Sequence, residues 1–417
     1  MHVLILGAGV VGLATAHVLA SEGHRVTVLD AERAPGRGAS FANGGQLSYS
    51  YVAPFAGPGV AGKVPGWLLD PDGPLRFRPA FDPHQWKWLW AFLRACNAPR
   101  AERTTAALLS LAALSRSLTR EVVALPDMKF DFAPAGKLVL QPDAAAMAGA
   151  VRQMEVQARL GSVQRALDRE GCLAVEPALR HLAHRIHGGI WTESEEAGDA
   201  RLFCEALAAR LAQGNRAVAF RMGVRARQII RAEGRVRGVL SDEGVHEADA
   251  VVLALGNGAR ALAGPLGLDL PIYPLKGYSL TLDVLEEAEA PRVSITDSAA
   301  KIVYARLGRR LRVAGMADLV GHDPRMEEGR LTTLVRQARA AFPRASDWRE
   351  LRPWAGLRPA TPTGLPLVGA APGVPGLWLN LGQGSLGFTL AMGSAAVLAA
   401  RLEGREPPIP DGDFRLG

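Results

Sequence analysis

The chain has 417 residues, of which 48% are hydrophobic and 21% are charged, and its formal net charge is +7. This length predicts two domains, and the composition is that of an ordinary soluble globular protein. The positive charge comes mainly from arginines scattered without a dense basic cluster, so it predicts a solvated surface and no nucleic-acid site. The cysteines show neither CxxC nor Cys/His spacing, which predicts no metal site, no disulfide framework and a cytoplasmic location; they are Cys96, Cys172 and Cys204.

The first thirty residues predict a dinucleotide-binding βαβ unit. A short apolar strand over 3–6 enters a glycine-rich turn over 7–12, a helix follows, and a second apolar strand over 26–29 ends at Asp30. Such glycines allow a tight turn, approach of a pyrophosphate and close helix packing, and the helix N-terminus attracts phosphate. The acidic residue suits a ribose and repels a 2′-phosphate, which disfavours NADP and leaves FAD and NAD open. The nucleotide-binding residues predicted here are Gly7, Gly9, Val10, Val11, Gly12 and Asp30.

The opening run has an alternative interpretation as a signal peptide or membrane anchor, because residues 3–20 contain no Lys, Arg, Asp or Glu. However, no basic segment precedes it and its glycines are spaced for a turn. We also expect no other segment to offer the roughly 20 apolar residues that cross a bilayer. The sequence therefore favours the nucleotide-binding unit.

Helical and strand patterns follow along the first half of the chain. Residues 54–83 are rich in Gly and Pro and predict an ordered excursion over the surface. Residues 84–125 have a helical pattern with a tryptophan-rich packing surface. Strands over 136–140 and 189–191 flank a helix over 144–160.

The second half alternates a helix with short strands. Asp199 is placed to cap a helix over 201–213, which a turn at 214–215 closes. Strands are predicted over 217–220, 227–230, 235–240 and 248–256, with 278–282 and 301–315 as paired strands of a second domain.

Three further segments carry a family resemblance. They are 40–48 (SFANGGQLS), 354–369 (WAGLRPATPTGLPLVG) and 377–390 (LWLNLGQGSLGFTL). These resemble the flavin-contacting segments of the D-amino-acid oxidase superfamily of FAD-dependent oxidoreductases. Residues 274–281 (PLKGYSLT), together with Gly44-Gly45-Gln46, are most similar to the bacterial D-amino-acid dehydrogenases of the small-subunit type. The resemblance extends from residue 1 to about residue 410.

The resemblance implies an α/β fold with two interleaved domains. A Rossmann-like FAD-binding domain would comprise 1–55, 195–258 and 352–417. An α+β substrate-binding domain on a mixed, largely antiparallel sheet would comprise 56–194 and 259–351.

The resemblance also implies a noncovalent FAD. The C-terminal flavin segments and the turn over 256–258 contain no cysteine for a covalent attachment, and a glycine-rich turn would aim N–H groups at the flavin N1–C2=O edge. Gln383 stands where the family often has His, and an amide cannot carry a positive charge. The further cofactor-binding residues are Ser40, Asn43, Gly44, Gly45, Gln46, Val224, Leu255, Gly256, Gly356, Gln383, Gly384, Ser385, Leu386, Gly387, Phe388 and Thr389.

For the substrate, the resemblance implies that Arg358 pairs with a carboxylate, for which a planar guanidinium is well suited. The alternative is a structural arginine paired with an acidic side chain. Tyr51, Tyr278 and Tyr304 are further candidates for lining the pocket, with ordinary packing as their alternative.

The implied reaction is oxidative deamination of D-amino acids to 2-oxo acids and ammonia, with hydride transfer from Cα to flavin N5 and no assigned base. Electrons would pass to a quinone or another respiratory-chain acceptor. Peripheral contact with the inner face of the membrane would suit this, although no amphipathic anchor is evident in the sequence. Alternatives are oxidation of glycine, sarcosine, D-proline or hydroxy-D-proline, and a non-catalytic nucleotide-binding module. The sequence leaves open the preferred D-amino acid, the choice between oxygen and a quinone as acceptor, the role of Gln383, the oligomeric state and the association with a membrane.

Overall fold

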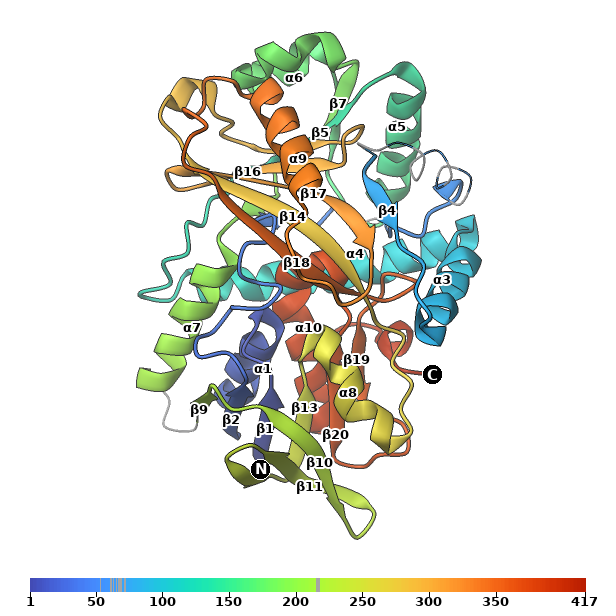
Figure 1. Cartoon of the computed structure of the whole chain (residues 1–417), viewed down its shortest axis with the longest axis vertical. Helices are drawn as coiled ribbons and strands as arrows, with labels where there is room; N and C mark the ends of the chain where they lie inside the picture. Colours follow the sequence, from blue (N-terminus) through green and yellow to red (C-terminus); the bar gives the residue numbers. More distant parts are fainter. Residues whose placement is uncertain are drawn as a thin grey trace.

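The computed structural model describes residues 1–52, 54–60, 62, 64, 66, 70, 73–214 and 218–417. Two large sheets organise these residues, and they occupy the lower and upper parts of the view in Figure 1. The predicted surface excursion over 54–83, the first residue of the predicted strand over 217–220 and the turn at 214–215 fall partly outside the described residues.

The first sheet has six strands in the order β19-β20-β13-β1-β2-β9. All neighbours are parallel except β19, which runs antiparallel to β20. Because β1 lies at the centre, the glycine-rich turn after it opens at the carboxyl edge, where ligands bind in such sheets. The strands are β1 (His2–Leu6), β2 (Arg25–Asp30), β9 (Val218–Met222), β13 (Ala250–Leu253), β19 (Leu367–Ala370) and β20 (Leu377–Leu381).

Both faces of this sheet are covered, which explains why its strands are apolar throughout. Val3 and Ile5 pack with helices on one face, whereas Leu4 and Leu6 pack on the other face against a small antiparallel sheet and α8. The helices on the first face are α1 (Val10–Ser21), α4 (Ala98–Val123), α7 (Ala200–Gly214) and α10 (Gly387–Leu402). The small sheet comprises β10 (Ala226–Ala232), β11 (Arg235–Ser241) and β12 (Gly244–Glu247), and α8 spans Ala259–Ala263.

The second large sheet has nine strands. Eight follow the order β18-β14-β17-β16-β15-β5-β7-β6, and β4 pairs with β17. Its pairs are antiparallel except β5 with β15 and β4 with β17. The predicted mixed, largely antiparallel sheet is therefore confirmed. The strands are β4 (Leu75–Phe77), β5 (Lys137–Gln141), β6 (Arg165–Asp168), β7 (Gly188–Thr192), β14 (Tyr273–Asp283), β15 (Ser294–Asp297), β16 (Ile302–Leu307), β17 (Arg310–Leu319) and β18 (Arg352–Ala360).

Helices pack against the upper sheet, and short elements complete the described chain. The helices are α5 (Ala144–Ala158), α6 (Arg169–Val175) and α9 (Glu328–Ala341), and the two-stranded ribbon is β3 (Gln46–Leu47) with β8 (Glu196–Ala197). The 3₁₀ segments are η1 (Pro177–Arg185), η2 (Gly256–Gly258), η3 (Gly264–Leu266), η4 (Glu287–Glu289), η5 (Gly384–Leu386) and η6 (Gly412–Phe414).

The helical pattern over 84–125 is divided into two helices. α3 (Pro83–Ala95) ends before Asn97, whose side chain caps α4 by accepting a hydrogen bond from the Arg100 N–H. A proline near the start of α4 favours this break, because its ring suits the first turn of a helix and not the interior. The tryptophan surface is only partly buried, since Trp88 is inside and Trp90 is exposed.

Two expectations need adjustment. The segment 352–417, assigned to the FAD-binding domain, begins with β18, which pairs with β14 in the upper sheet. In addition, Gly384–Leu402 is apolar and long enough to cross a membrane by length and composition, with a mean hydropathy of 1.4, contrary to our expectation. Yet 72% of it is buried, and a Cβ at Gly393 would lie 2.7 Å from the Leu111 carbonyl oxygen of α4. This helix therefore serves as a core helix.

Candidate active site

A cavity of about 800 Å³ is lined by residues of both large sheets. The predicted cofactor-binding residues that line it come from the glycine-rich turn, the segment after β2, the segment after β13, β18 and the start of α10. They are Gly7, Gly9, Val10, Val11, Asp30, Ser40, Asn43, Gly44, Gly45, Gln46, Leu255, Gly256, Gly356, Gln383, Gly384, Ser385, Leu386, Gly387 and Phe388. Segments far apart in the sequence thus meet at one cavity.

The glycine-rich turn has the geometry that a dinucleotide requires. Gly7 has a φ of +113°, and a Cβ there would lie 2.5 Å from the Ala254 carbonyl oxygen. A Cβ at Gly12 would lie 1.9 Å from the Gly7 carbonyl oxygen, so this residue supports the turn from behind and does not line the cavity. α1 begins after Gly9 without a side-chain cap. The first N–H, that of Val10, donates to the Ser40 hydroxyl at 3.1 Å, and the N–H groups that follow it are suited to bind phosphate.

Asp30 lies at the mouth of this turn. Its carboxylate accepts hydrogen bonds from the backbone N–H groups of Ala8, at 2.6 Å, and Glu32, at 2.8 Å. Because a carboxylate has about four acceptor positions, capacity remains for a ribose hydroxyl. Val224 lies behind Asp30 and donates its N–H to the Asp30 carbonyl oxygen. Val224 does not line the cavity but supports the strand end, and its contact with the cofactor stays a prediction.

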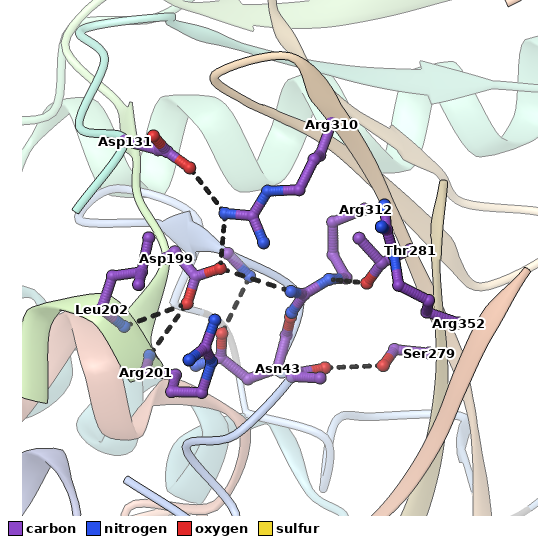
Figure 2. A network of polar contacts seen from close by, with 12 residues as sticks. Asn43, Asp131, Asp199, Arg201, Leu202, Ser279, Thr281, Arg310, Arg312 and Arg352 are labelled. Carbon is purple, nitrogen blue, oxygen red and sulfur yellow. Dashed lines mark hydrogen bonds and ion pairs between the residues drawn. The ribbon is translucent and has the colours of Figure 1, made fainter. Parts of the chain in front are cut away.

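The segment after β2 is attached to the upper sheet by polar side chains, as Figure 2 shows. Arg312 donates to the Asn43 carbonyl oxygen at 2.6 Å, and the Ser279 hydroxyl donates to the Ala42 carbonyl oxygen at 2.6 Å. The Gln46 amide donates to two carbonyl oxygens of β15 and β16, at 3.0 and 3.1 Å. These contacts fix the backbone of a cavity wall against both domains.

Asp199 is the centre of this network (Figure 2). One carboxylate oxygen caps α7, as predicted, and the other lies 3.0 Å from Arg310 and 3.5 Å from Arg312. Burial lowers the pKa of Arg312 to about 10, while the charge of Asp199 opposes that shift. The ion pair therefore connects the start of α7 with the sheet above the cavity.

The C-terminal wall begins at Gln383, whose amide donates to the Asn380 side chain at 2.7 Å. η5 and α10 follow, and α10 has no side-chain cap at its N-terminus. Unpaired N–H groups at such an end suit a partial negative charge. Thr389 does not line the cavity; its hydroxyl accepts a hydrogen bond from the Ser48 N–H at 3.0 Å. Thr389 therefore supports Ser48, and its contact with the cofactor stays a prediction.

Arg358 lines the cavity from β18. Its Nη1 donates to the Met316 carbonyl oxygen at 2.9 Å, and its guanidinium lies against Gly277 of β14. Burial lowers the pKa of this guanidinium. Within the described ranges, no Asp or Glu oxygen lies within 4.0 Å of it. The alternative of a structural ion pair is therefore not observed, and a cation remains available to a carboxylate.

The three candidate tyrosines differ in position. Tyr278 lies at the cavity wall, but its hydroxyl donates to Asp318 at 2.9 Å, and burial raises its pKa. Tyr304 does not line the cavity, because its ring is buried against Phe342 with ring centres 5.1 Å apart. The sequence could not show which face of its strand pointed inward. Tyr51 lines the cavity and is 38% exposed.

Sequence reasoning missed Lys137, which lines the cavity from β5 with only 3% exposure. Its Nζ donates to the Ser48 hydroxyl at 2.7 Å and lies 4.4 Å from the centre of the Tyr51 ring. Burial lowers its pKa to about 8, against the opposing effect of Glu195. A lysine within the apolar run over 137–140 was the available signal, since such a charge is rarely buried without a reason.

Comparison with known proteins agrees with this architecture. The sequence matches the family described as "DAO: FAD dependent oxidoreductase" over residues 2–401. It is 50% identical to D-amino acid dehydrogenase 2 of Ralstonia nicotianae over all of both chains. It is 49% identical to D-amino acid dehydrogenase 2 of Pseudomonas aeruginosa, covering 98% of this chain and 96% of that protein.

Among solved structures, glycine oxidase from Geobacillus kaustophilus has a TM-score of 0.77 and 21% identity, covering 100% of this chain and 98% of that one. L-proline dehydrogenase from P. horikoshii has a TM-score of 0.78 and 17% identity, covering 100% and 96%. These similarities confirm the fold. On the family match and the full-length identity, the chain belongs to the DAO family of FAD-dependent oxidoreductases.

Proposed function

We propose that this chain is an FAD-dependent D-amino acid dehydrogenase that deaminates D-amino acids to 2-oxo acids and ammonia. The observation that carries the proposal is Arg358, a cation without a carboxylate partner among the described residues, in a cavity that also contains a dinucleotide-binding turn. The full-length relatives named D-amino acid dehydrogenase support the D-amino acid as substrate, in preference to glycine, sarcosine or a proline derivative.

The residues present fit FAD. The N-terminus of α1 would hold the pyrophosphate, Asp30 would hold a ribose, and the start of α10 would supply N–H groups to the flavin. None of the three cysteines lines the cavity, so none of them is placed to form an 8α-cysteinyl bond, and we propose that the cofactor is held noncovalently. When bound, FAD supplies the electron acceptor at N5 for the hydride that leaves the substrate Cα.

The protein contributes alignment and exclusion of water. Arg358 holds the α-carboxylate in a fixed orientation, because a guanidinium binds a carboxylate through two parallel hydrogen bonds. Gly277 and Gly356 line the cavity without side chains. A Cβ at Gly277 would collide with the Arg358 guanidinium, and a Cβ at Gly356 would collide with the Trp354 ring. A buried pocket favours the neutral amine that the reaction needs, so no catalytic base is assigned.

We also propose a quinone or another respiratory-chain carrier as acceptor, with the protein bound peripherally at the cytoplasmic face of the membrane. Helix α3 supports this proposal, since Trp88 and Phe92 line the cavity on one side of it while the opposite side is exposed. Exposed aromatic and basic residues together are typical of helices that lie in a membrane interface. The exposed residues are Trp86, Lys87, Trp90, Leu93 and Arg94.

Product analysis tests the proposed reaction. Purified holoenzyme is incubated with a D-amino acid and an artificial electron acceptor, and the 2-oxo acid and ammonia are quantified against reduced acceptor. The proposal expects equal amounts of all three. Reduced acceptor without a 2-oxo acid would overturn it.

A further inference from the structure

The charged residues that line the cavity fall into two groups. Asp30, Glu32 and Arg37 surround the nucleotide end, below the upper sheet. Arg358, Lys301 and Lys137 belong to the upper sheet and the turn between its strands, and no carboxylate among the described residues lines the cavity there. The charged side chains that line the substrate end are therefore all cationic, and such a lining favours anionic groups of a ligand.

Lys137 lies on β5, four strands away from β14, against which the Arg358 guanidinium lies. Its ammonium has three N–H donors, and one of them donates to the Ser48 hydroxyl. Ser48 also lines the cavity, as does Tyr51, over whose ring the ammonium lies. Donor capacity thus remains at the end of the cavity away from Arg358.

Thr296 provides an independent observation at the same end. It lies on β15, next to β5, where it pairs with Val139, and its side chain lines the cavity. Its Oγ1 is buried without a hydrogen-bond partner among the described residues. A buried hydroxyl without a partner is unfavourable, so a ligand atom that hydrogen-bonds with it is favoured.

We propose that Lys137, Ser48 and Thr296 form a subsite for a side-chain carboxylate, so that the preferred substrates are acidic D-amino acids. The inference rests on the proposed function, in which Arg358 binds the α-carboxylate. The subsite then binds the second carboxylate of the same substrate, with Lys137 supplying the charge and the hydroxyl of Thr296 a further donor.

The charge of Lys137 disfavours substrates with a cationic or an apolar side chain. A cationic side chain would be repelled by Lys137, and an apolar one would leave the ammonium and the Thr296 hydroxyl without new partners. Glu195 does not compete for the same position, because it does not line the cavity and one of its oxygens accepts the Ser50 N–H at 2.6 Å. It lies behind the lysine and offsets part of the cost of burying it.

The experiment compares D-glutamate with D-norvaline, which has the same carbon chain length in its side chain but no side-chain oxygens. The ratio of their kcat/KM values isolates the side-chain contribution. In the unmodified holoenzyme we expect D-glutamate to be preferred by about ten- to a hundredfold, the range for hydrogen bonds to a charged group. In Lys137→Met the ratio should fall by a similar factor.

Lys129→Met is the matched control, because Lys129 is exposed and does not line the cavity. The ratio of kcat/KM for D-glutamate to kcat/KM for D-norvaline should be the same in this variant as in the unmodified protein. Thr296→Val is a second variant that removes only the hydroxyl, and it should lower the ratio by about three- to tenfold. FAD content and melting temperature of each variant show that folding is retained.

The inference is overturned if the unmodified protein does not prefer D-glutamate, or if neither Lys137→Met nor Thr296→Val lowers the ratio. It is also overturned if Lys137→Met lowers the activity with both substrates equally. Failure of the proposed function looks different, because then neither D-glutamate nor D-norvaline would reduce the flavin at all.

Discussion

Gly277 and Arg358 lie on neighbouring antiparallel strands, and the guanidinium of Arg358 occupies the space that a side chain at Gly277 would fill. A Cβ at Gly277 would lie 2.2 Å from Nη2 of Arg358. The glycine therefore allows the arginine to lie flat against the sheet and to reach the Met316 carbonyl oxygen. The position of the Arg358 guanidinium therefore depends on the glycine at 277, and both residues lie in the segments that resemble the family.

Gly277→Ala is expected to weaken substrate binding without loss of FAD. The added methyl group displaces the guanidinium, so KM for D-amino acids should rise by about tenfold or more, since misplaced charge-assisted hydrogen bonds are lost. Steady-state kinetics and the flavin absorbance of the purified variant measure the two effects. Gly329→Ala is the control, because nothing lies within 4 Å of a Cβ there and the position is helical. Equal kinetics of the two variants would contradict this relationship.

Arg358→Lys tests the need for a planar guanidinium. A lysine keeps the charge but cannot form two parallel hydrogen bonds, so the dissociation constant of the substrate should rise by about ten- to a hundredfold. Rapid-mixing measurements of flavin reduction at several substrate concentrations give this constant. If the constant is unchanged, Arg358 does not bind the α-carboxylate.

Asp199→Ala is expected to destabilise the protein strongly. It leaves the buried guanidinium of Arg312 without its carboxylate, and breaking such a pair costs about 3–5 kcal/mol of unfolding free energy. Asp131→Asn is the control, because Asp131 is 32% exposed and pairs with Arg310, for which about 0–1 kcal/mol is expected, and Asn tolerates the φ of 54° at this position. Urea unfolding of the two holoproteins measures the difference. Equal losses would show that the network in Figure 2 does not hold the domains together.

The preference for D-glutamate over D-norvaline should depend on pH. Lys137 is protonated below its pKa of about 8 and loses its charge above it, so the kcat/KM ratio should be constant at lower pH and fall as the pH rises through about 8. The groups that face this ammonium are Glu195 and Tyr51, and burial raises the pKa of that tyrosine, which stays neutral in this range. Dividing by the D-norvaline value removes the titration of groups that both substrates share. A ratio that does not change between about pH 7 and 9 would contradict a role for this lysine.

Membrane binding should depend on the exposed side of α3. The variant Trp90→Gln with Leu93→Gln should bind less to vesicles that contain phosphatidylglycerol, because it removes apolar groups that enter the interface. Co-sedimentation with vesicles measures the bound fraction. Val163→Gln, at a residue that is 80% exposed outside α3, is the control. If the unmodified protein does not bind these vesicles, the proposed peripheral contact is wrong.

The parts of the fold that depend on local sequence could be predicted. Glycine is required at positions 7 and 12 because a Cβ there would collide with the backbone, which holds for any chain with this turn. Asn97 and Asp199 cap helices through hydrogen bonds with residues that follow them directly in the sequence. The parts that depend on distant contacts could not. Tyr304 alternates with residues on the other side of β16, and only the assembled sheet decides which side faces the cavity.

The polar groups at the substrate end are a second example. Lys137 and Thr296 are about 160 residues apart in the sequence, and they line the same cavity because β5 and β15 pair in parallel, which no short motif indicates. Likewise, the exposed side of α3 could not be distinguished from a buried one, because tryptophan is common on both.

Anaerobic reduction of the bound flavin by single enantiomers tests the central claim most directly. The purified holoenzyme is mixed without oxygen with the D- and L-forms of glutamate and norvaline, and with glycine and sarcosine, and the loss of flavin absorbance is followed. The account predicts rapid reduction by the D-enantiomers and none by the L-enantiomers. Reduction by L-enantiomers, by glycine or sarcosine alone, or by none of these compounds would contradict it.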